Sequence, residues 1–237
     1  MKKFCHIIFS IALTFALSSI PTISYSFKVK LPGAKTDEKS VNIEELEKEN
    51  KIICILVANA TAAFLEGTAK IFSAHGKKEI AKKYQAVADD IRKNPEDPQK
   101  LKDAMNMVEK GNRDLKDIEE EKLKLSKQGK KELGQGVILV GAGGILDVKG
   151  GQQASDYVDK LQGAIDGVKA DPVKYGAGTA NTLNNNLNLM TLLATNLPKH
   201  GAAITDTFSG LIKYASLNGV SISQSDAEKK AKDIEKG

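Results

Sequence analysis

Few residues of this chain have the type and spacing that catalysis or metal binding requires. Apart from His6 near the N-terminus, the histidines are His75 and His200, and each stands beside a glycine at a predicted helix end. Neither has a cysteine or an acidic cluster at metal-ligand spacing. The sequence contains no G-x-S-x-G or H-E-x-x-H motif, and Asp147 and Asp166 are expected to be solvated carboxylates. It therefore predicts no catalytic residue, no cofactor-binding residue and no metal ligand, and favours a protein that is not an enzyme.

The glycine-rich segment VILVGAGG, residues 137–144, is the strongest candidate for a ligand-binding loop. It resembles the strand, glycine loop and helix that open a dinucleotide-binding Rossmann unit, whose fingerprint is G-x-G-x-x-G or Ala. Gly141 and Gly143 fill the first two places, but Leu146 stands at the third. A Rossmann unit also needs a second strand about 20 residues further on, whereas residues 157–168 repeat with a helical period. Nucleotide binding is therefore not favoured.

The same segment fits a buried helix that a neighbouring backbone approaches closely. Glycines in a helix cost up to ~1 kcal/mol each against alanine, so close packing must compensate for them. The small residues expected at the contact are Gly136, Ala142, Gly143 and Gly144. The larger residues expected to fill the surrounding core are Val137, Ile138, Val140, Ile145 and Val148.

Three apolar runs, residues 52–65, 137–146 and 187–197, raise the question of membrane insertion. A membrane-spanning helix needs ~20 mostly apolar residues, and the uncharged run 137–146 has about half that length. Packing inside a soluble bundle explains this run best, so membrane contact is allowed but not favoured. Cys54 lies in the first run between two isoleucines, and it is predicted to be a buried hydrophobe rather than a reactive thiol.

The N-terminus has the three parts of a secretory signal peptide. Lys2 and Lys3 precede an apolar run, residues 7–17, and small and polar residues follow up to Ser26. We expect cleavage near Ser26, with Ser24 as the alternative, and a periplasmic or secreted protein. The short leader and the lysine-rich, tryptophan-free composition favour a bacterial source.

Charge is nearly balanced once the leader is removed. Lys2 and Lys3 leave with it, so 35 basic residues become 33 against 30 acidic ones. The positive excess lies in residues 77–133, where the signs alternate as on solvated helix faces rather than forming a basic patch. Nucleic acid is therefore not a predicted partner.

Hydrophobic periodicity predicts helices along most of the mature chain. Apolar residues recur every three or four positions in residues 41–75, 77–93 and 98–132. Asp97 and Pro98 have the residue types that cap and begin the third of these helices.

The 98–132 segment has coiled-coil-like spacing. Asn112 occupies a position where a buried polar residue can fix helix register. An antiparallel hairpin with residues 77–93 is the favoured arrangement, because glycines weaken the seam. Self-association of two copies through the 98–132 helix is the alternative.

The C-terminal third continues the helical pattern. Helices are predicted for residues 183–197, ending before Pro198, and for 204–217, closed by Asn218 and Gly219. Ser225 is expected to open a capping box before the charged tail. A row of asparagines on the first of these helices is expected to form a solvated face or hydrogen bonds between helices, with ligand binding as the alternative. The row consists of Asn181, Asn184, Asn185, Asn186 and Asn188.

These patterns predict an all-α fold, a bundle of about six to eight helices after a cleaved signal peptide. The expected organisation is a signal peptide at 1–26, an extended lead-in at 27–40, a helical bundle domain at 41–220 and a charged C-terminal helix or tail at 221–237.

The function predicted from the sequence is correspondingly broad. We expect a non-enzymatic binding or structural module of the bacterial envelope or extracellular space, with an unknown protein or lipid partner and no cofactor. The main alternative is a secreted, membrane-active protein, pore-forming or lipid-interacting, whose three apolar runs are packed in the soluble form and exposed at a bilayer. A nucleotide-binding enzyme is a distant third.

Overall fold

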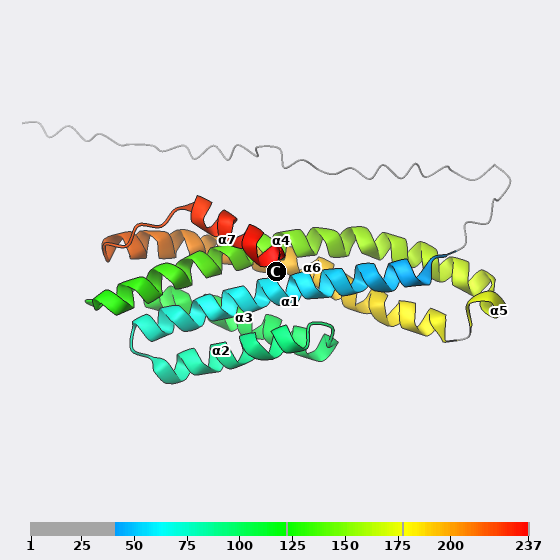
Figure 1. Cartoon of the computed structure of the whole chain (residues 1–237), viewed down its shortest axis with the longest axis horizontal. Helices are drawn as coiled ribbons and strands as arrows, with labels where there is room; N and C mark the ends of the chain where they lie inside the picture. Colours follow the sequence, from blue (N-terminus) through cyan, green and yellow to red (C-terminus); the bar gives the residue numbers. More distant parts are fainter. Residues whose placement is uncertain (1–40, 122, 177, 237) are drawn as a thin grey trace, which may run out of the picture. The chain divides into compact units, whose positions relative to one another are not determined.

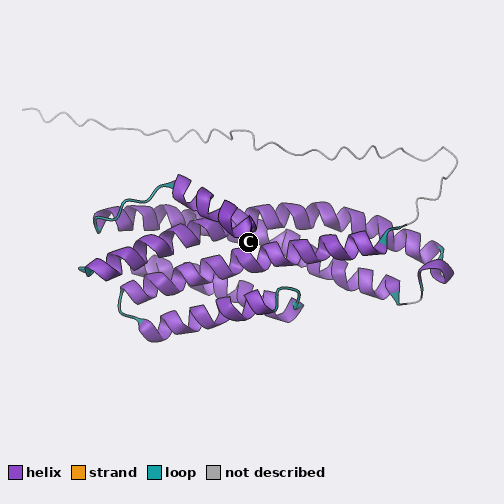
Figure 2. Cartoon of the chain, in the orientation of Figure 1, coloured by secondary structure: helices purple, strands orange, loops and turns teal. Residues whose placement is uncertain are grey.

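Seven helices and no strand make up the residues that this computed structural model describes, which are 41–121, 123–176 and 178–236. The predicted all-α bundle of six to eight helices is confirmed for this part of the chain (Figure 2). The predicted signal peptide and lead-in lie outside the described residues. In chain order the helices are α1 (Ile43–Ala74), α2 (Lys78–Lys93), α3 (Pro98–Glu119), α4 (Lys127–Ala170), α5 (Pro172–Tyr175), α6 (Thr179–Leu217) and α7 (Gln224–Lys236) (Figure 1).

The three long helices α1, α4 and α6 form the framework, and α4 packs against both of the others. α4 runs antiparallel to α1, because Gly136 of α4 lies opposite Gly67 whereas Gly143 lies opposite Ala60. α2 and α3 form a helical hairpin that packs on α1, as predicted from the 77–93 pattern. α7 lies on α4, with a smaller contact on α1 (Figure 1).

Capping residues explain where several helices begin. The Asn42 side chain accepts a hydrogen bond from the Glu45 amide at the start of α1, at 3.2 Å. Asp97 caps α3 by accepting from the amides of residues 99 and 100, and Pro98 occupies the first turn, as predicted. Ser126 caps α4 by accepting from the Gly129 amide.

α1 lies at the centre of the bundle and is buried over most of its length. It is also long and apolar enough to cross a membrane, and 78% of its most apolar 18-residue stretch is buried inside the protein. The hairpin covers its C-terminal half: Phe72 stacks on Tyr84 of α2 with ring centroids 5.7 Å apart. Gly111 of α3 lies against the Phe64 ring, so the hairpin reaches the middle of α1 as well.

Glycines set the distance between the long helices. A Cβ added to Gly67 would stand 2.6 Å from the Gly136 carbonyl oxygen, and one added to Gly143 would stand 2.9 Å from that of Ala60. On the other side of α4, a Cβ on Gly144 would stand 2.6 Å from a methyl carbon of Ile204. The prediction that VILVGAGG is a buried helical segment in close backbone contact is confirmed. Val137 and Val140 are buried as predicted, and Ile138 is half-buried. The prediction was wrong for Ile145 and Val148, because both side chains are more than a third exposed.

Two predicted helix boundaries were wrong. The segments 183–197 and 204–217 belong to one helix, α6, which contains Pro198. Proline removes one hydrogen bond and its ring crowds the preceding turn, but buried neighbours on both sides hold the helix together. Gly151 of α4 faces the proline ring, since a Cβ there would stand 3.0 Å from the Pro198 Cδ.

The segment 98–132, which was predicted to be one helix, is divided between α3 and α4. α3 ends at Glu119 in an acidic run, which is unfavourable at the negative end of the helix dipole. Ser126 then caps the start of α4.

The predicted C-terminal capping box was wrong by two residues. Ser223, not Ser225, precedes α7, and its amide donates to the Asp226 carboxylate at 2.9 Å. The Ser223 hydroxyl donates to the same oxygen at 2.7 Å.

Candidate functional site

Among the described residues, four buried polar side chains have atoms without a hydrogen-bond partner. They are Thr61 of α1, Asn112 of α3, Asp147 of α4 and His200 of α6. The atoms concerned are the Thr61 Oγ1, the Asn112 Oδ1, both Asp147 carboxylate oxygens and the His200 Nδ1. Buried polar groups in proteins are nearly always hydrogen-bonded, so this set marks an energetically costly part of the core. We call these four residues the polar layer.

The register of α4 on α1 places Asp147 at the level of Thr61. Gly143 and Gly150 stand about one turn before and after Asp147, and they face the α1 turns on either side of Thr61. Because side chains three or four residues apart share a helix face, Asp147 lies on the same face as these glycines.

The other two members belong to the same level of the bundle. Gly144 and Gly151 of α4 face α6 on either side of His200. The His200 Nε2 lies 3.3 Å from the Glu109 Oε1 of α3, and Asn112 lines the same groove as His200. The polar layer therefore draws one residue from each of four helices.

Burial disfavours the charged form of Asp147. Its side chain is 1% exposed, and desolvation raises the pKa of the carboxyl well above the usual value. The prediction that Asp147 is a solvated carboxylate was wrong. The signal was present in the sequence, since Asp147 stands four residues after Gly143 and three before Gly150 on the face that packs against α1.

A groove of about 230 Å³ between α3 and α6 opens to solvent beside the polar layer. It contains the charged side chains Glu109, Arg113 and Lys116 together with Asn112 and His200. The prediction that His200 stands at a helix end was wrong, because it is buried within α6. This groove can offer hydrogen-bond donors and acceptors to a small polar ligand.

A second groove, of about 340 Å³, lies where α1, α2 and α4 meet. It is lined by Ala69, Lys70, Ser73, Lys78, Ala81, Lys82, Gln85 and Glu132. The lysines make its rim basic, and no buried polar side chain of the polar layer reaches it.

His75 and Cys54 occupy the structural positions predicted for them. His75 is the C-cap of α1, and its ring nitrogens lie 2.7 Å from the Ile71 carbonyl oxygen and 2.7 Å from the Tyr214 hydroxyl. Cys54 is fully buried, and desolvation is the main cause that raises the pKa of its thiol to about 12. A thiol held protonated in this way is a poor nucleophile.

Within residues 41–121, 123–176 and 178–236, no group of three or more His, Cys, Asp or Glu side chains is placed to hold a metal ion. No protein-family model, curated protein or solved structure matches the chain.

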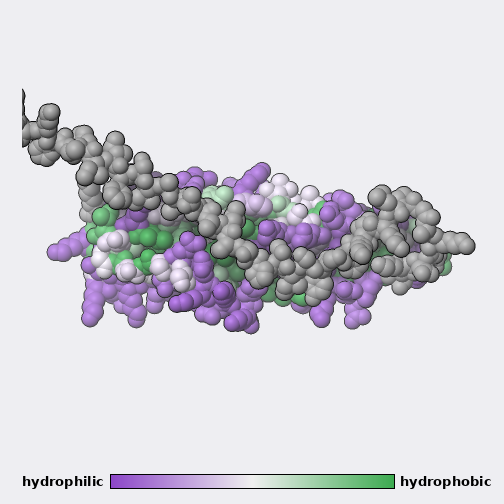
Figure 3. Space-filling model, turned by 90° about the horizontal axis from the view of Figure 1, so that it is seen from above, coloured by the Kyte–Doolittle hydropathy of each residue, from purple (hydrophilic) through white to green (hydrophobic). Residues whose placement is uncertain are grey.

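The apolar runs pack together along α4. Runs 52–65 and 137–146 pack directly on each other through Gly143 and Ala60. The third run, 187–197, lies against a later part of α4, where Leu197 meets Gly150. Hydrophilic side chains flank the apolar surface that remains visible from above (Figure 3). The most apolar segments are thus concentrated on the α1–α4 pair.

The asparagine row of α6 lies mainly at the surface. Asn181, Asn185 and Asn188 are exposed, and Asn184 and Asn186 are half-buried. Their side chains form no hydrogen bond with the described residues, which agrees with the predicted solvated face.

Proposed function

We propose that this protein is an exported, non-enzymatic module whose partner is a lipid bilayer. In its soluble form, α1 and the apolar part of α4 are buried in the bundle, and they contact lipid when the bundle opens. The observation that carries this proposal is α1 itself. Its length and apolar composition suit a membrane span, and it is held at the centre of the bundle. A core helix of an ordinary soluble protein has the same burial, so an experiment must separate the two.

The contact between α1 and α4 supports a role in lipid. Water drives the burial of large apolar side chains, but this force is absent between helices inside a bilayer. Helices in membranes associate instead through small residues that let backbones approach closely. The backbone contacts at Gly67, Gly136 and Gly143 are of this kind, so the α1–α4 pair can stay together in either solvent.

The polar layer lowers the cost of opening the bundle. Each buried polar group without a partner costs roughly 1–3 kcal/mol relative to a solvated one. Opening the bundle around the α1–α4 pair would let Asn112 and His200 regain water, so part of the free energy lost on exposing apolar surface would be recovered. Such a bundle is suited to exchange contacts between its own helices for contacts with a bilayer.

A soluble binding module of the envelope is the second candidate. The groove between α3 and α6 favours it, because buried His200 and Asn112 stand beside the charged Arg113 and Lys116. A small polar ligand there would leave α1 buried and would stabilise the bundle rather than open it.

Dye release from lipid vesicles tests the first candidate. The exported protein is added to vesicles of phosphatidylcholine, with and without phosphatidylglycerol, that contain a self-quenched dye. We expect release that depends on protein concentration. Intact vesicles, together with protein that does not float with them in a density gradient, would exclude the proposal and favour the soluble binding module.

A fluorescent probe on α1 tests whether this helix enters lipid. In a Cys54→Ala background, an environment-sensitive dye is attached at Ile52→Cys, because Ile52 is 53% exposed and can be labelled without unfolding. We expect its emission to shift to the blue when vesicles are added. The matched control is the dye at Lys102→Cys, an exposed position on α3, where no shift is expected. Equal responses at both positions would contradict insertion of α1.

A further inference from the structure

α7 covers an apolar groove that runs between α1 and α4. Ala231 of α7 packs into this groove, and the cluster that it forms there is separate from the main core. The residues beneath it belong to the apolar runs 52–65 and 137–146. They are Leu56, Ala60, Ala142 and Leu146. The last helix of the chain thus lies over the two segments that the proposed function assigns to lipid.

The apolar contact that holds α7 in place is small. Ala227 and Ala231 are the two buried residues of its 13, and Ile234 is half-buried. A methyl group buries far less apolar surface than a leucine or phenylalanine side chain, so the contact contributes little compared with the core of α1. Ala227 belongs to the main core, where it lies close to Gly141 of α4, whereas Ala231 belongs to the separate cluster, so α7 can leave without removing a large side chain from the main core.

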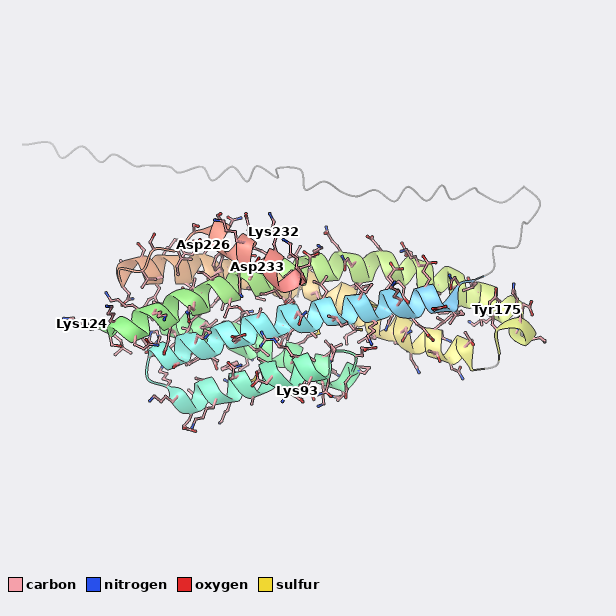
Figure 4. The ribbon with its side chains drawn as sticks, in the orientation of Figure 1. Lys93, Lys124, Tyr175, Asp226, Lys232 and Asp233 are labelled. Atoms are coloured by element: carbon pink, nitrogen blue, oxygen red, sulfur yellow. The ribbon has the colours of Figure 1, made fainter. Side chains whose placement is uncertain are left out.

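The polar contact that holds α7 is also weak. Lys149 of α4 forms an ion pair with Glu235, and both side chains are about 40% exposed. Exposed ion pairs contribute little to stability, because water screens them. The outer face of α7 is solvated, and Lys232 and Asp233, which are labelled in Figure 4, lie among its exposed residues.

Val220 and Ile222 anchor the connection to α6 on the main core, so α7 can move as a unit beyond it. Residues 218–223 contain no helix, and Gly219 adopts φ of +72°, a conformation that favours glycine. The N-cap of α7, Ser223 with Asp226, lies within the segment itself and uses no atom of α1 or α4. α7 therefore keeps its helix start when its contact with the groove is lost.

Apolar side chains that are already exposed adjoin the covered groove. Ile52 stands one turn before Leu56 on α1, and Ile145 stands beside Leu146 on α4; these two isoleucines are 53% and 38% exposed. Removal of α7 would join covered and uncovered residues into one apolar strip along both helices. Large exposed apolar patches mark sites of protein or membrane interaction.

We propose that α7 is a detachable cover, whose displacement from the α1–α4 groove uncovers the apolar runs 52–65 and 137–146 for entry into a bilayer. This inference rests on the proposed function for the identity of the partner, but displacement of α7 can be measured without lipid. In the closed form, α7 lies over the α1–α4 groove. Its release is the step that commits α1 and α4 to the membrane.

A cleavable tether tests the cover. In the Cys54→Ala background, Lys149→Cys and Glu235→Cys are joined by a short bis-maleimide that contains a disulfide. We expect dye release from vesicles to fall at least about tenfold, as for an equilibrium shifted strongly to the closed form, and to recover after reduction of the linker. The matched control joins Lys100→Cys of α3 to Asp90→Cys of α2, another exposed ion pair, and leaves dye release unchanged.

A variant that displaces α7 gives the opposite result. Ala231→Glu puts a carboxylate into the groove, where an unpaired charge is strongly unfavourable. We expect increased binding of a hydrophobic dye without lipid, faster amide hydrogen exchange throughout α7 and faster dye release from vesicles. Ser225→Glu adds the same charge at an exposed position of α7 and should change none of these.

The outcomes separate the two proposals. If the protein releases dye but the α7 tether has no effect, the cover is wrong and the membrane function stands. If Ala231→Glu exposes apolar surface and loosens α7 but no variant releases dye or binds vesicles, the membrane function is wrong. If Ala231→Glu changes neither hydrogen exchange nor hydrophobic-dye binding, α7 is not detachable.

Discussion

Gly143 of α4 and Ala60 of α1 are in backbone contact, because a Cβ on the glycine would stand 2.9 Å from the Ala60 carbonyl oxygen. The same added atom would stand 2.9 Å from the Phe64 amide nitrogen. Backbone atoms cannot rotate away as the end of a flexible side chain can. The spacing of the two central helices therefore depends on the absence of a side chain at this position.

We expect Gly143→Leu to lower the free energy of unfolding by about 1–3 kcal/mol, because the new side chain forces α1 and α4 apart. Urea denaturation followed by circular dichroism measures the change. Gly163, further along α4, is the matched control because no atom lies within 4 Å of an added Cβ. Gly163→Ala should instead stabilise the protein by roughly 0.5–1 kcal/mol, through the higher helix propensity of alanine. Equal destabilisation by both changes would contradict the close contact.

The buried Asp147 predicts how stability depends on pH. Burial raises the pKa of this carboxyl in the folded protein above its usual value, so the folded state keeps the proton over a pH range in which the unfolded chain has lost it. Its contribution is therefore most favourable below about pH 4 and is lost as the pH rises through the raised pKa, with a slope of up to about 1.4 kcal/mol per pH unit.

Asp147→Asn should remove this dependence and raise stability at neutral pH. The measurement is the difference in unfolding free energy between the two proteins at several pH values. The difference should grow with pH in favour of Asp147→Asn. Asp166→Asn, which changes an exposed carboxylate on the same helix, serves as the control. A difference that stays constant with pH would show that Asp147 ionises normally in the folded state.

Cys54 should resist thiol reagents in the native protein. Its side chain is fully buried, and burial raises the pKa of the thiol to about 12, so access and thiolate formation are both suppressed. Labelling with a maleimide, followed by mass spectrometry, should show no modification until denaturant is added. Ile52→Cys, two residues earlier on α1, should react promptly. Rapid native labelling of Cys54 itself would contradict the packing described for α1.

The cap of α7 should be visible in the titration of Asp226. The Ser223 hydroxyl and amide both donate to this carboxylate and lower its pKa. The cap therefore stabilises α7 above the ordinary pKa of an aspartate, about 3.9, and this stabilisation is lost as the pH falls through the lowered pKa.

Carbon-detected NMR can follow this carboxylate directly. Ser223→Ala should move the titration midpoint of Asp226 upward, toward the ordinary value. Ser225→Ala removes the neighbouring serine and should leave the midpoint where it is. A midpoint that responds to Ser225 instead would place the capping box at the position first suggested by the sequence pattern.

Local patterns were enough to predict the fold class and several helix ends. The periodicity of α1, the Asp97–Pro98 start of α3 and the burial of Cys54 all follow from residues that are close in the chain, because helix capping and amphipathic spacing act over one or two turns. Leu146 at the third fingerprint position likewise indicated a helix instead of a nucleotide loop.

Tertiary contacts decided the rest, because they join residues that the sequence pattern treats separately. Pro198 suggested a helix end, yet packing against Gly151 of α4 allows α6 to continue through it. The spacing of Asp147 from Gly143 and Gly150 indicated its helix face, but only the packing of α4 against α1 and α6 buried it. The separate apolar cluster beneath α7 forms because Ala231 meets residues of α1 and α4, which lie far from it in the chain. Which side chains lose contact with water depends on how the helices pack together, and a single helix does not determine it.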